Sequence, residues 1–145
     1  MNIIETMQAL LGSFPQITAL NIDYNGNAPD DFGLYPTGDK LVKEDVLGNQ
    51  KRSHTFILYA DFQSFNNYDR LQNSGTLLSL QYWLEESAAD QTVISVVNGT
   101  ERSGRLEKIT CANGMLFNIP DGNLNTAVRY QLQITADYTI ESEEL

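Results

Sequence analysis

The sequence has little of what cross-links a chain or draws it to nucleic acid or to a membrane. Cys111 is the only cysteine among its 145 residues, which excludes an internal disulfide and a cysteine-ligated zinc site. No apolar run approaches the roughly 20 residues of a membrane-spanning helix, and we expect no signal peptide at the start. Nine basic against nineteen acidic residues leave a net charge of −10, which disfavours binding to nucleic acid and anionic lipid.

What is present is typical of a compact single domain. The hydrophobic fraction of 41%, with 10% aromatic residues, is too high for a disordered chain. A chain of this length buries about two-thirds of its unfolded surface, which is enough for a real core. We therefore expect one domain over residues 1–145, with a solvated acidic tail at about 141–145.

The first half of the chain predicts a helix, a short strand, a hairpin and a second helix. Apolar residues at three- and four-residue steps indicate a helix over 3–14, with Asn2 as a cap, and residues 17–24 alternate like a strand. The turn-forming residues of 25–39 predict an exposed loop or a short edge strand. Strands at 41–47 and 54–63 form a hairpin, and a helix follows at 66–86.

The second half predicts strands. Residues 93–97 precede an Asn98-Gly99 turn, and Asn113-Gly114 predicts a hairpin between 105–112 and 115–119. Residues 126–141 alternate strictly, and a strand of that length, about 50 Å, must bend, bulge or extend past its own sheet. The whole order favours an α+β fold, in which two helices pack on one face of a largely antiparallel sheet.

The helix at 66–86 carries two apolar patches instead of one. Leu77, Leu80, Trp83 and Leu84 share one side, whereas Leu78 and Tyr82 fall on the opposite side. Either the N-terminal helix covers the second patch, or that patch contacts another subunit.

Few residues indicate chemistry. His54 is the only histidine and has no neighbouring catalytic partner in sequence, and Cys111 is expected to be a buried, inert thiol. Asp121–Asn125 begins like a calcium loop, but Thr126 and Leu132 replace the required glycine and glutamate. We therefore expect no enzyme activity, no cofactor and no metal.

Two stretches resemble a family of phage proteins. Residues 52–86, RSHTFILYADFQSFNNYDRLQNSGTLLSLQYWLEE, are an apolar strand and a helix with the pattern N-x-x-R-L-x-N that ends in W-L-E. Residues 130–138, YQLQITADY, are the closing strand. Together with the order of elements along nearly the whole chain, they resemble small minor structural proteins, sometimes labelled minor capsid proteins, of tailed phages and prophages of Gram-positive bacteria. These proteins are similar to the tail terminators of long-tailed phages.

The resemblance implies a structural protein with a tail terminator-like fold. Tail terminators form a ring, commonly hexameric, that caps the growing tail tube and later joins it to the head. The expected partners are further copies of this chain and other phage tail or head-completion proteins, in the virion and in the host bacterial cytoplasm during assembly. DNA would pass through such a ring without sequence-specific contacts, and the family carries no catalytic residues to transfer.

A closed ring needs two different surfaces of each copy to meet. The sequence offers the second patch of the helix at 66–86, the tip of the hairpin and the overlong last strand. The candidate interface residues on these elements are Leu78, Tyr82, Lys51, Arg52, Tyr138 and Ile140.

Three alternatives stay open. In the first, the chain is another phage morphogenesis component of the same size, such as a head-completion or tail-tube protein. In the second, it is a small ligand-binding α+β domain. In the third, it is a minimal enzyme that uses His54 with an acidic partner. The aromatic residues that would line the ligand pocket are Phe56, Tyr59, Trp83 and Tyr130.

Overall fold

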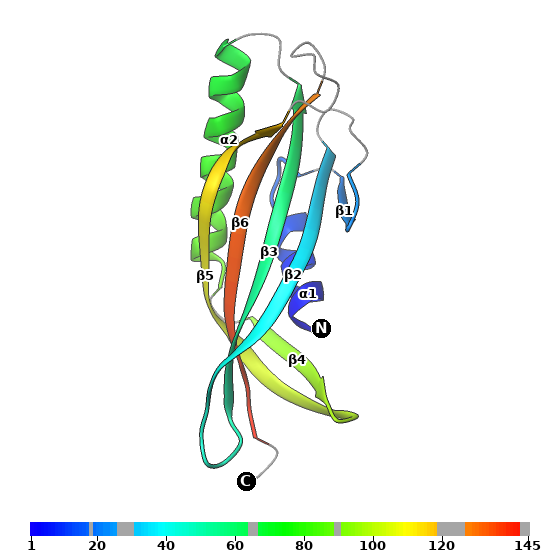
Figure 1. The fold of residues 1–145 in the computed structure, drawn as a ribbon, viewed down its shortest axis with the longest axis vertical. Coiled ribbons are helices and arrows are strands. Elements are labelled where there is room, and N and C mark those ends of the chain that lie inside the picture. The colour runs from blue at the N-terminus through cyan, green and yellow to red at the C-terminus, as the bar shows by residue number, and fades with distance from the viewer. Residues whose placement is uncertain (18, 26–30, 64–66, 89–90, 119–126, 143–145) are drawn as a thin grey trace.

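The structure is a computed structural model that describes residues 1–17, 19–25, 31–63, 67–88, 91–118 and 127–142. The elements in this part of the chain are α1 (Ile3–Gly12), β1 (Leu20–Ile22), β2 (Asp31–Glu44), β3 (Gln50–Gln63), α2 (Asn67–Glu86), β4 (Thr92–Val97), β5 (Thr100–Asn118) and β6 (Ala127–Ile140). The strands form a six-stranded sheet in the order β1-β2-β3-β6-β5-β4 (Figure 1). Within the described residues, no helix has the length and hydropathy to cross a membrane.

The expected α+β fold, with two helices packed on one face of a largely antiparallel sheet, is wrong. The structure is mostly β, with 57% of it in strands, and its mixed sheet curls into a half-barrel. β1 runs parallel to β2, and the other neighbouring strands are antiparallel. The sequence pattern predicted too few residues in strands, because residues typical of loops and hairpin turns lie inside long, bent strands.

The segment at 25–39 is one source of this error. From Asp31 onward it belongs to the 14-residue strand β2, in which Phe32 and Leu34 are buried. β1 pairs with β2 only from Phe32 to Leu34, so it does not reach Pro36. On the other edge of β2, Pro36 pairs with Phe56 of β3. Proline is tolerated there because the outer edge of the strand needs no N–H donor for a neighbour.

Asn113-Gly114 is the second source. β5 continues through this dipeptide as a strand of 19 residues, and both flanks pair with β6. The register shifts between Ala112 and Met115, and Asn113 has φ 56°. A β-bulge can hold a residue with positive φ without turning the strand back, so the dipeptide bends β5 instead of making a hairpin. Asn98-Gly99, in contrast, forms the expected turn between β4 and β5.

β6 does not extend past its sheet. Its 14 residues pair along their full length with the 14 residues of β3, from Gln50↔Ile140 to Gln63↔Ala127. The alternation that predicted this strand is confirmed, because the even-numbered residues from Val128 to Ile140 are buried. The excess length is therefore matched by an equally long neighbour in the same chain.

Both helices bury one side against the core of the curled sheet. α1 begins at a capping box, in which the Asn2 side chain accepts a hydrogen bond from the Glu5 amide at 2.8 Å. The prediction that Asn2 caps this helix is confirmed. α2 buries Leu77, Leu80 and Leu84, and these side chains join the same core cluster as those of α1 and the strands. Phe14, after α1, packs on Trp83 with 5.4 Å between ring centroids.

We predict that Gly104→Ala destabilises the fold, because a Cβ at this position would overlap the carbonyl oxygen of Thr139 on β6. The expected loss in the free energy of unfolding is at least about 2 kcal/mol, measured by urea denaturation. Gly75→Ala in α2 is the matched control: nothing lies within 4 Å of the added Cβ, so it should stabilise by about 0.5–1 kcal/mol. Equal effects of the two substitutions would contradict this packing.

Candidate functional site

The β2–β3 hairpin extends beyond the core, at the opposite end of the molecule from the start of α2 (Figure 1). We call residues 40–52 of this hairpin the arm. Four of its apolar side chains are exposed, at 43–101% of their accessible surface: Leu41, Val42, Val46 and Leu47. Apolar side chains gathered on one projecting element are typical of a surface that meets another protein.

The tip of the arm has a defined conformation. The Asp45 carboxylate accepts from the amides of Leu47 at 2.9 Å and Asn49 at 3.0 Å, and from the Asn49 side chain at 2.9 Å. Hydrogen bonds from Asn49 hold the pKa of Asp45 below its usual value. Arg102 of β5 donates to the carbonyl of Gly48 at 2.6 Å, and the amide of Ser142 donates to Asn49 Oδ1 at 2.6 Å. The arm is therefore tied to the strands beside it.

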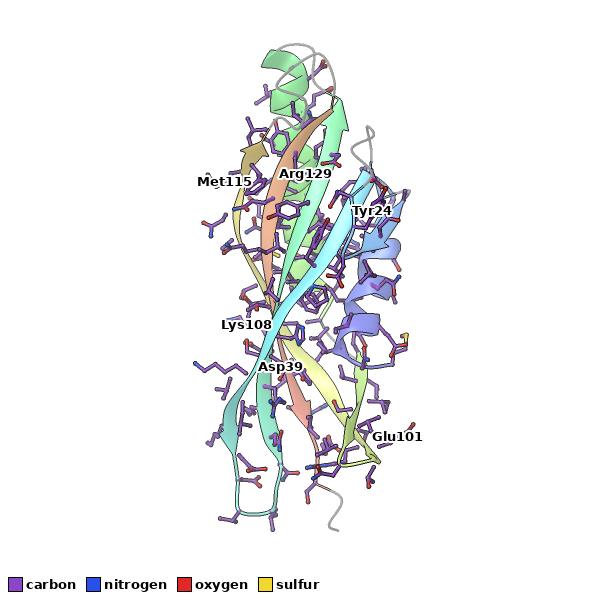
Figure 2. All side chains as sticks on the ribbon, turned by 45° about the vertical axis from the view of Figure 1, so that its right-hand side comes forward. Tyr24, Asp39, Glu101, Lys108, Met115 and Arg129 are labelled. Carbon is purple, nitrogen blue, oxygen red and sulfur yellow. The ribbon has the colours of Figure 1, made fainter. Side chains whose placement is uncertain are left out.

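At the root of the arm, Asp39 joins three strands (Figure 2). On β3, Arg52 Nε contacts one carboxylate oxygen at 2.5 Å and His54 Nδ1 the other at 2.8 Å; on β6, the Tyr138 hydroxyl donates to the second oxygen at 2.6 Å. His54 and Tyr138 are buried. This cluster fixes the direction in which the arm leaves the core.

The ionisation of Asp39 follows from these partners. Burial opposes the charge, but hydrogen bonds from Tyr138, Arg52 and His54 outweigh it and lower the pKa of Asp39. Burial, together with the bond to Asp39, raises the pKa of Tyr138, so its hydroxyl stays protonated and donates. The sequence pattern does not single out Asp39, because 25–39 is expected to be an exposed loop or a short edge strand, and neither reveals the register of Asp39 opposite His54.

The structure separates the six predicted interface residues into two groups. Lys51 is exposed on the arm, and Leu78 and Tyr82 of α2 are 46% and 58% exposed. Arg52 is half-buried against Asp39, and Tyr138 and Ile140 are buried in the core. Within the single chain, the last three therefore pack beneath the arm.

α2 carries an exposed apolar row along the side opposite to its buried face. At about 100° per residue, Leu71, Leu78 and Tyr82 lie within a narrow arc, and Glu85 and Glu86 flank it in the last turn. All five are exposed. α1 does not cover this row, which is exposed; α1 contacts β1 and β4, and Phe14 beyond its end packs on Trp83 of α2. We call these five residues the α2 stripe.

The outer face of the sheet carries an aromatic row above a buried ion pair. The rings of Tyr35 and Tyr59 lie 5.2 Å apart, and those of Tyr59 and Phe117 lie 4.9 Å apart. Asp61 is fully buried, and both of its oxygens contact Arg129, at 2.8 and 3.2 Å. The hydrogen bond to Asp61 raises the pKa of Arg129, so this guanidinium is held as a structural cation.

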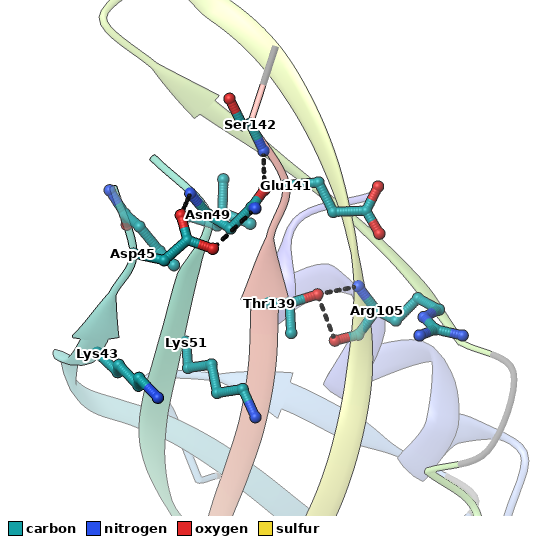
Figure 3. A pocket seen from close by; sticks show the side chains of 10 residues that line it. Lys43, Asp45, Asn49, Lys51, Arg105, Thr139, Glu141 and Ser142 are labelled. Carbon is teal, nitrogen blue, oxygen red and sulfur yellow. Dashed lines mark hydrogen bonds between the residues drawn. The ribbon is translucent and has the colours of Figure 1, made fainter. Parts of the chain in front are cut away.

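A cleft of about 580 Å³ lies where the arm meets β5 and β6 (Figure 3). Lys43 and Lys51 stand directly opposite each other on β2 and β3. Thr139 of β6 continues the row, and its hydroxyl accepts from the amide of Arg105 at 2.9 Å. Three cations thus border one cleft in a chain whose net charge is −10.

The residues considered for catalysis or ligand binding do not converge. His54 has Asp39 as an acidic partner, but its Nε2 is buried without a hydrogen-bond partner among the described residues. Cys111 is half-buried beside α2, and burial, with the nearby Glu85 charge, raises its pKa to about 12. Asp121–Asn125, the loop compared with a calcium site, lies outside the described residues. Within the described residues, no group of three or more potential metal ligands occurs.

The four aromatic residues proposed for a ligand pocket do not share one either. Phe56 and Tyr130 are in the core, whereas Tyr59 lies on the outer face beside Phe117. Trp83 packs against Phe14. Alternation along β3 already sets Phe56 and Tyr59 on opposite faces of the sheet, and the structure agrees.

No protein-family model matches the chain, and no curated protein sequence matches it.

We predict that Asp39→Asn lowers the free energy of unfolding at neutral pH by about 1–2 kcal/mol, because it removes a charged acceptor of three hydrogen bonds. The pKa of Asp39 is lower in the folded state than its usual 3.8. Its contribution is therefore present above that value and is lost as the pH falls through the folded pKa. Urea denaturation of both chains at several pH values should show the difference shrink in acid. A constant difference would contradict the role of the charge.

We predict that Arg129→Met costs about 3–5 kcal/mol of unfolding free energy, because it leaves the buried Asp61 carboxylate without its cation. The double variant Asp61→Asn, Arg129→Met should lose less than the single one. Thermal and urea unfolding measure both. Equal losses in the single and double variants would show that packing of the Arg129 side chain, and not the charge on Asp61, decides the effect.

Proposed function

We propose that this protein is a virion assembly component of the tail terminator kind, which binds further copies of itself in a closed ring and joins that ring to other tail or head-completion proteins. The proposal follows the resemblance of residues 52–86 and 130–138 to minor structural proteins of tailed phages. It places the protein in the virion and, during assembly, in the cytoplasm of the bacterial host.

The exposed apolar arm is the observation that carries the proposal. Leu41, Val42 and Leu47 are 43–61% exposed, and Val46 is fully exposed, although the tip that holds Val46 and Leu47 is built from specific hydrogen bonds. A braced element that presents apolar side chains to water favours a partner protein, since their burial would gain about 25 cal/mol per Å².

A second exposed apolar surface, the α2 stripe, lies on a different part of the same chain. Two unlike surfaces favour a heterologous contact, in which the arm side of one copy meets another side of the next. Repeated around an axis, such a contact closes into a ring. A symmetric dimer would instead use one surface twice.

The net charge of −10 suits the same function. A ring around DNA must let the phosphate backbone pass, and an acidic lining gives little counterion release and hence little binding. The four basic residues Lys40, Lys43, Lys51 and Arg52 are gathered on the arm, out of nine in the chain. This leaves the rest of the surface strongly acidic.

We predict that the wild-type chain assembles with rising concentration, and that two pairs of serine substitutions each shift assembly to at least tenfold higher concentration. The pairs are Val42→Ser with Leu47→Ser on the arm, and Leu78→Ser with Tyr82→Ser on α2. Loss of exposed apolar contact at the interface is the expected cause. Light scattering coupled to size-exclusion chromatography measures the mass of each species.

Val96→Ser is the matched control, because Val96 is 69% exposed on β4, outside both surfaces. It should assemble like the wild type. Thermal unfolding of all variants should stay close to that of the wild type, since the substituted side chains are exposed. A wild-type chain that stays monomeric at every concentration would contradict the proposed function.

A further inference from the structure

We propose that the cleft beside the arm binds the C-terminal end of α2 from a second copy, so that Lys43 and Lys51 receive Glu85 and Glu86. This inference rests on the proposed self-assembly and specifies the two surfaces that meet. Its starting point is that each surface carries an electrostatic arrangement that is unfavourable in the single chain.

The lysine side is the first of these arrangements. Lys43 and Lys51 are cross-strand partners on β2 and β3, and like charges directly opposite each other destabilise a strand pair. In the part of the chain that the structure describes, the one anion near Lys51 is Glu107, at 3.9 Å, and both of these side chains are exposed. Among the described residues, no hydrogen bond or ion pair engages the Lys43 ammonium. The pair thus lacks a close anion among the described residues.

The carboxylates at the cleft do not fill this gap. Asp45 is engaged by the amides of Leu47 and Asn49 and by the Asn49 side chain. Glu141 lies on the Arg105 side of the cleft, across Thr139 from the two lysines (Figure 3). As far as the described residues go, the Lys43–Lys51 side of the cleft is therefore open to carboxylates from a second copy.

The helix side is the second arrangement. Glu85 and Glu86 close α2, and its last turn holds no basic residue. The C-terminus of a helix carries a partial negative charge of about −0.5, so two glutamates there repel it and each other. Neither forms an ion pair with another described residue. Tyr82 and Leu78, one and two turns earlier, add the apolar half of the surface.

The two surfaces are complementary in charge and in polarity. The arm offers two lysines beside exposed apolar side chains, and α2 offers two glutamates and the negative end of a helix beside exposed apolar side chains. Within one chain they lie on separate parts of the fold, with α2 along β5 and the arm beyond the core (Figure 1). The partner that satisfies both is a second copy of this chain, which again gives a head-to-tail contact.

Charge reversal tests this contact with two variants. The arm variant is Lys43→Glu with Lys51→Glu, and the helix variant is Glu85→Lys with Glu86→Lys. Alone, each should weaken assembly at least tenfold, because like charges meet at every contact. Mixed in equal amounts, the two should assemble again, since each reversed surface meets its complement when the copies alternate. Native mass spectrometry should then find equal numbers of both chains in every ring.

Lys108→Glu and Glu101→Lys are the controls, because both residues are exposed on β5 outside the proposed contact. Each should assemble like the wild type. The neutral variant Lys43→Gln with Lys51→Gln should weaken assembly less than the reversal does, and circular dichroism should show that all variants fold.

Two results would overturn the inference while leaving the proposed function intact. Either reversed variant, alone, assembles like the wild type, or the mixture stays dissociated although the wild type assembles. A wild type that never assembles overturns both. Recovery in the mixture alone supports the contact and excludes a general effect of net charge.

Discussion

The pairing of β3 with β6 is the interaction on which the rest of the structure depends. Fourteen residue pairs run in register without interruption, from Gln50↔Ile140 to Gln63↔Ala127. Since side chains alternate with a period of two, this register sends Phe56, Leu58 and their β6 partners into the core. A shift by one residue would expose them all. The same ladder extends below the core to the arm, so the element proposed for assembly is a continuation of the central strands.

The sequence predicted the parts of this fold that local pattern alone decides. The strict alternation of β6, the cap at Asn2 and the extent of α2 all follow from spacing that needs no distant partner. It failed at Asn113-Gly114 and at 31–39, where β6 and β3 decide the outcome. A turn-forming dipeptide in a strand becomes a bulge when both flanks have the same partner strand. A short stretch of sequence does not reveal that partner strand. The expected fold class therefore had too few residues in strands.

The residues of the candidate site also differ in whether local sequence spacing or a distant partner strand sets their position. The exposure of Leu78 and Tyr82 follows from helical spacing alone, which sets them opposite the buried face of α2. The exposure of Lys51 follows from its place near a turn. Tyr138 and Ile140 are buried in the single chain, because β3 is as long as β6 and pairs with it along its whole length. Asp39 and the Lys43–Lys51 pair required the register of β2 against β3, bulges included. Features that depend on which residues face each other across strands were beyond the sequence pattern.

The proposed function depends on two different surfaces, the arm with its cleft and the α2 stripe. These surfaces are complementary in charge and in polarity. The most direct test is the mass of the wild-type assembly, measured by native mass spectrometry over a range of protein concentrations. The account predicts one closed stoichiometry larger than a dimer, without an open series of higher oligomers. A chain found only as a monomer or a symmetric dimer at every concentration would contradict it.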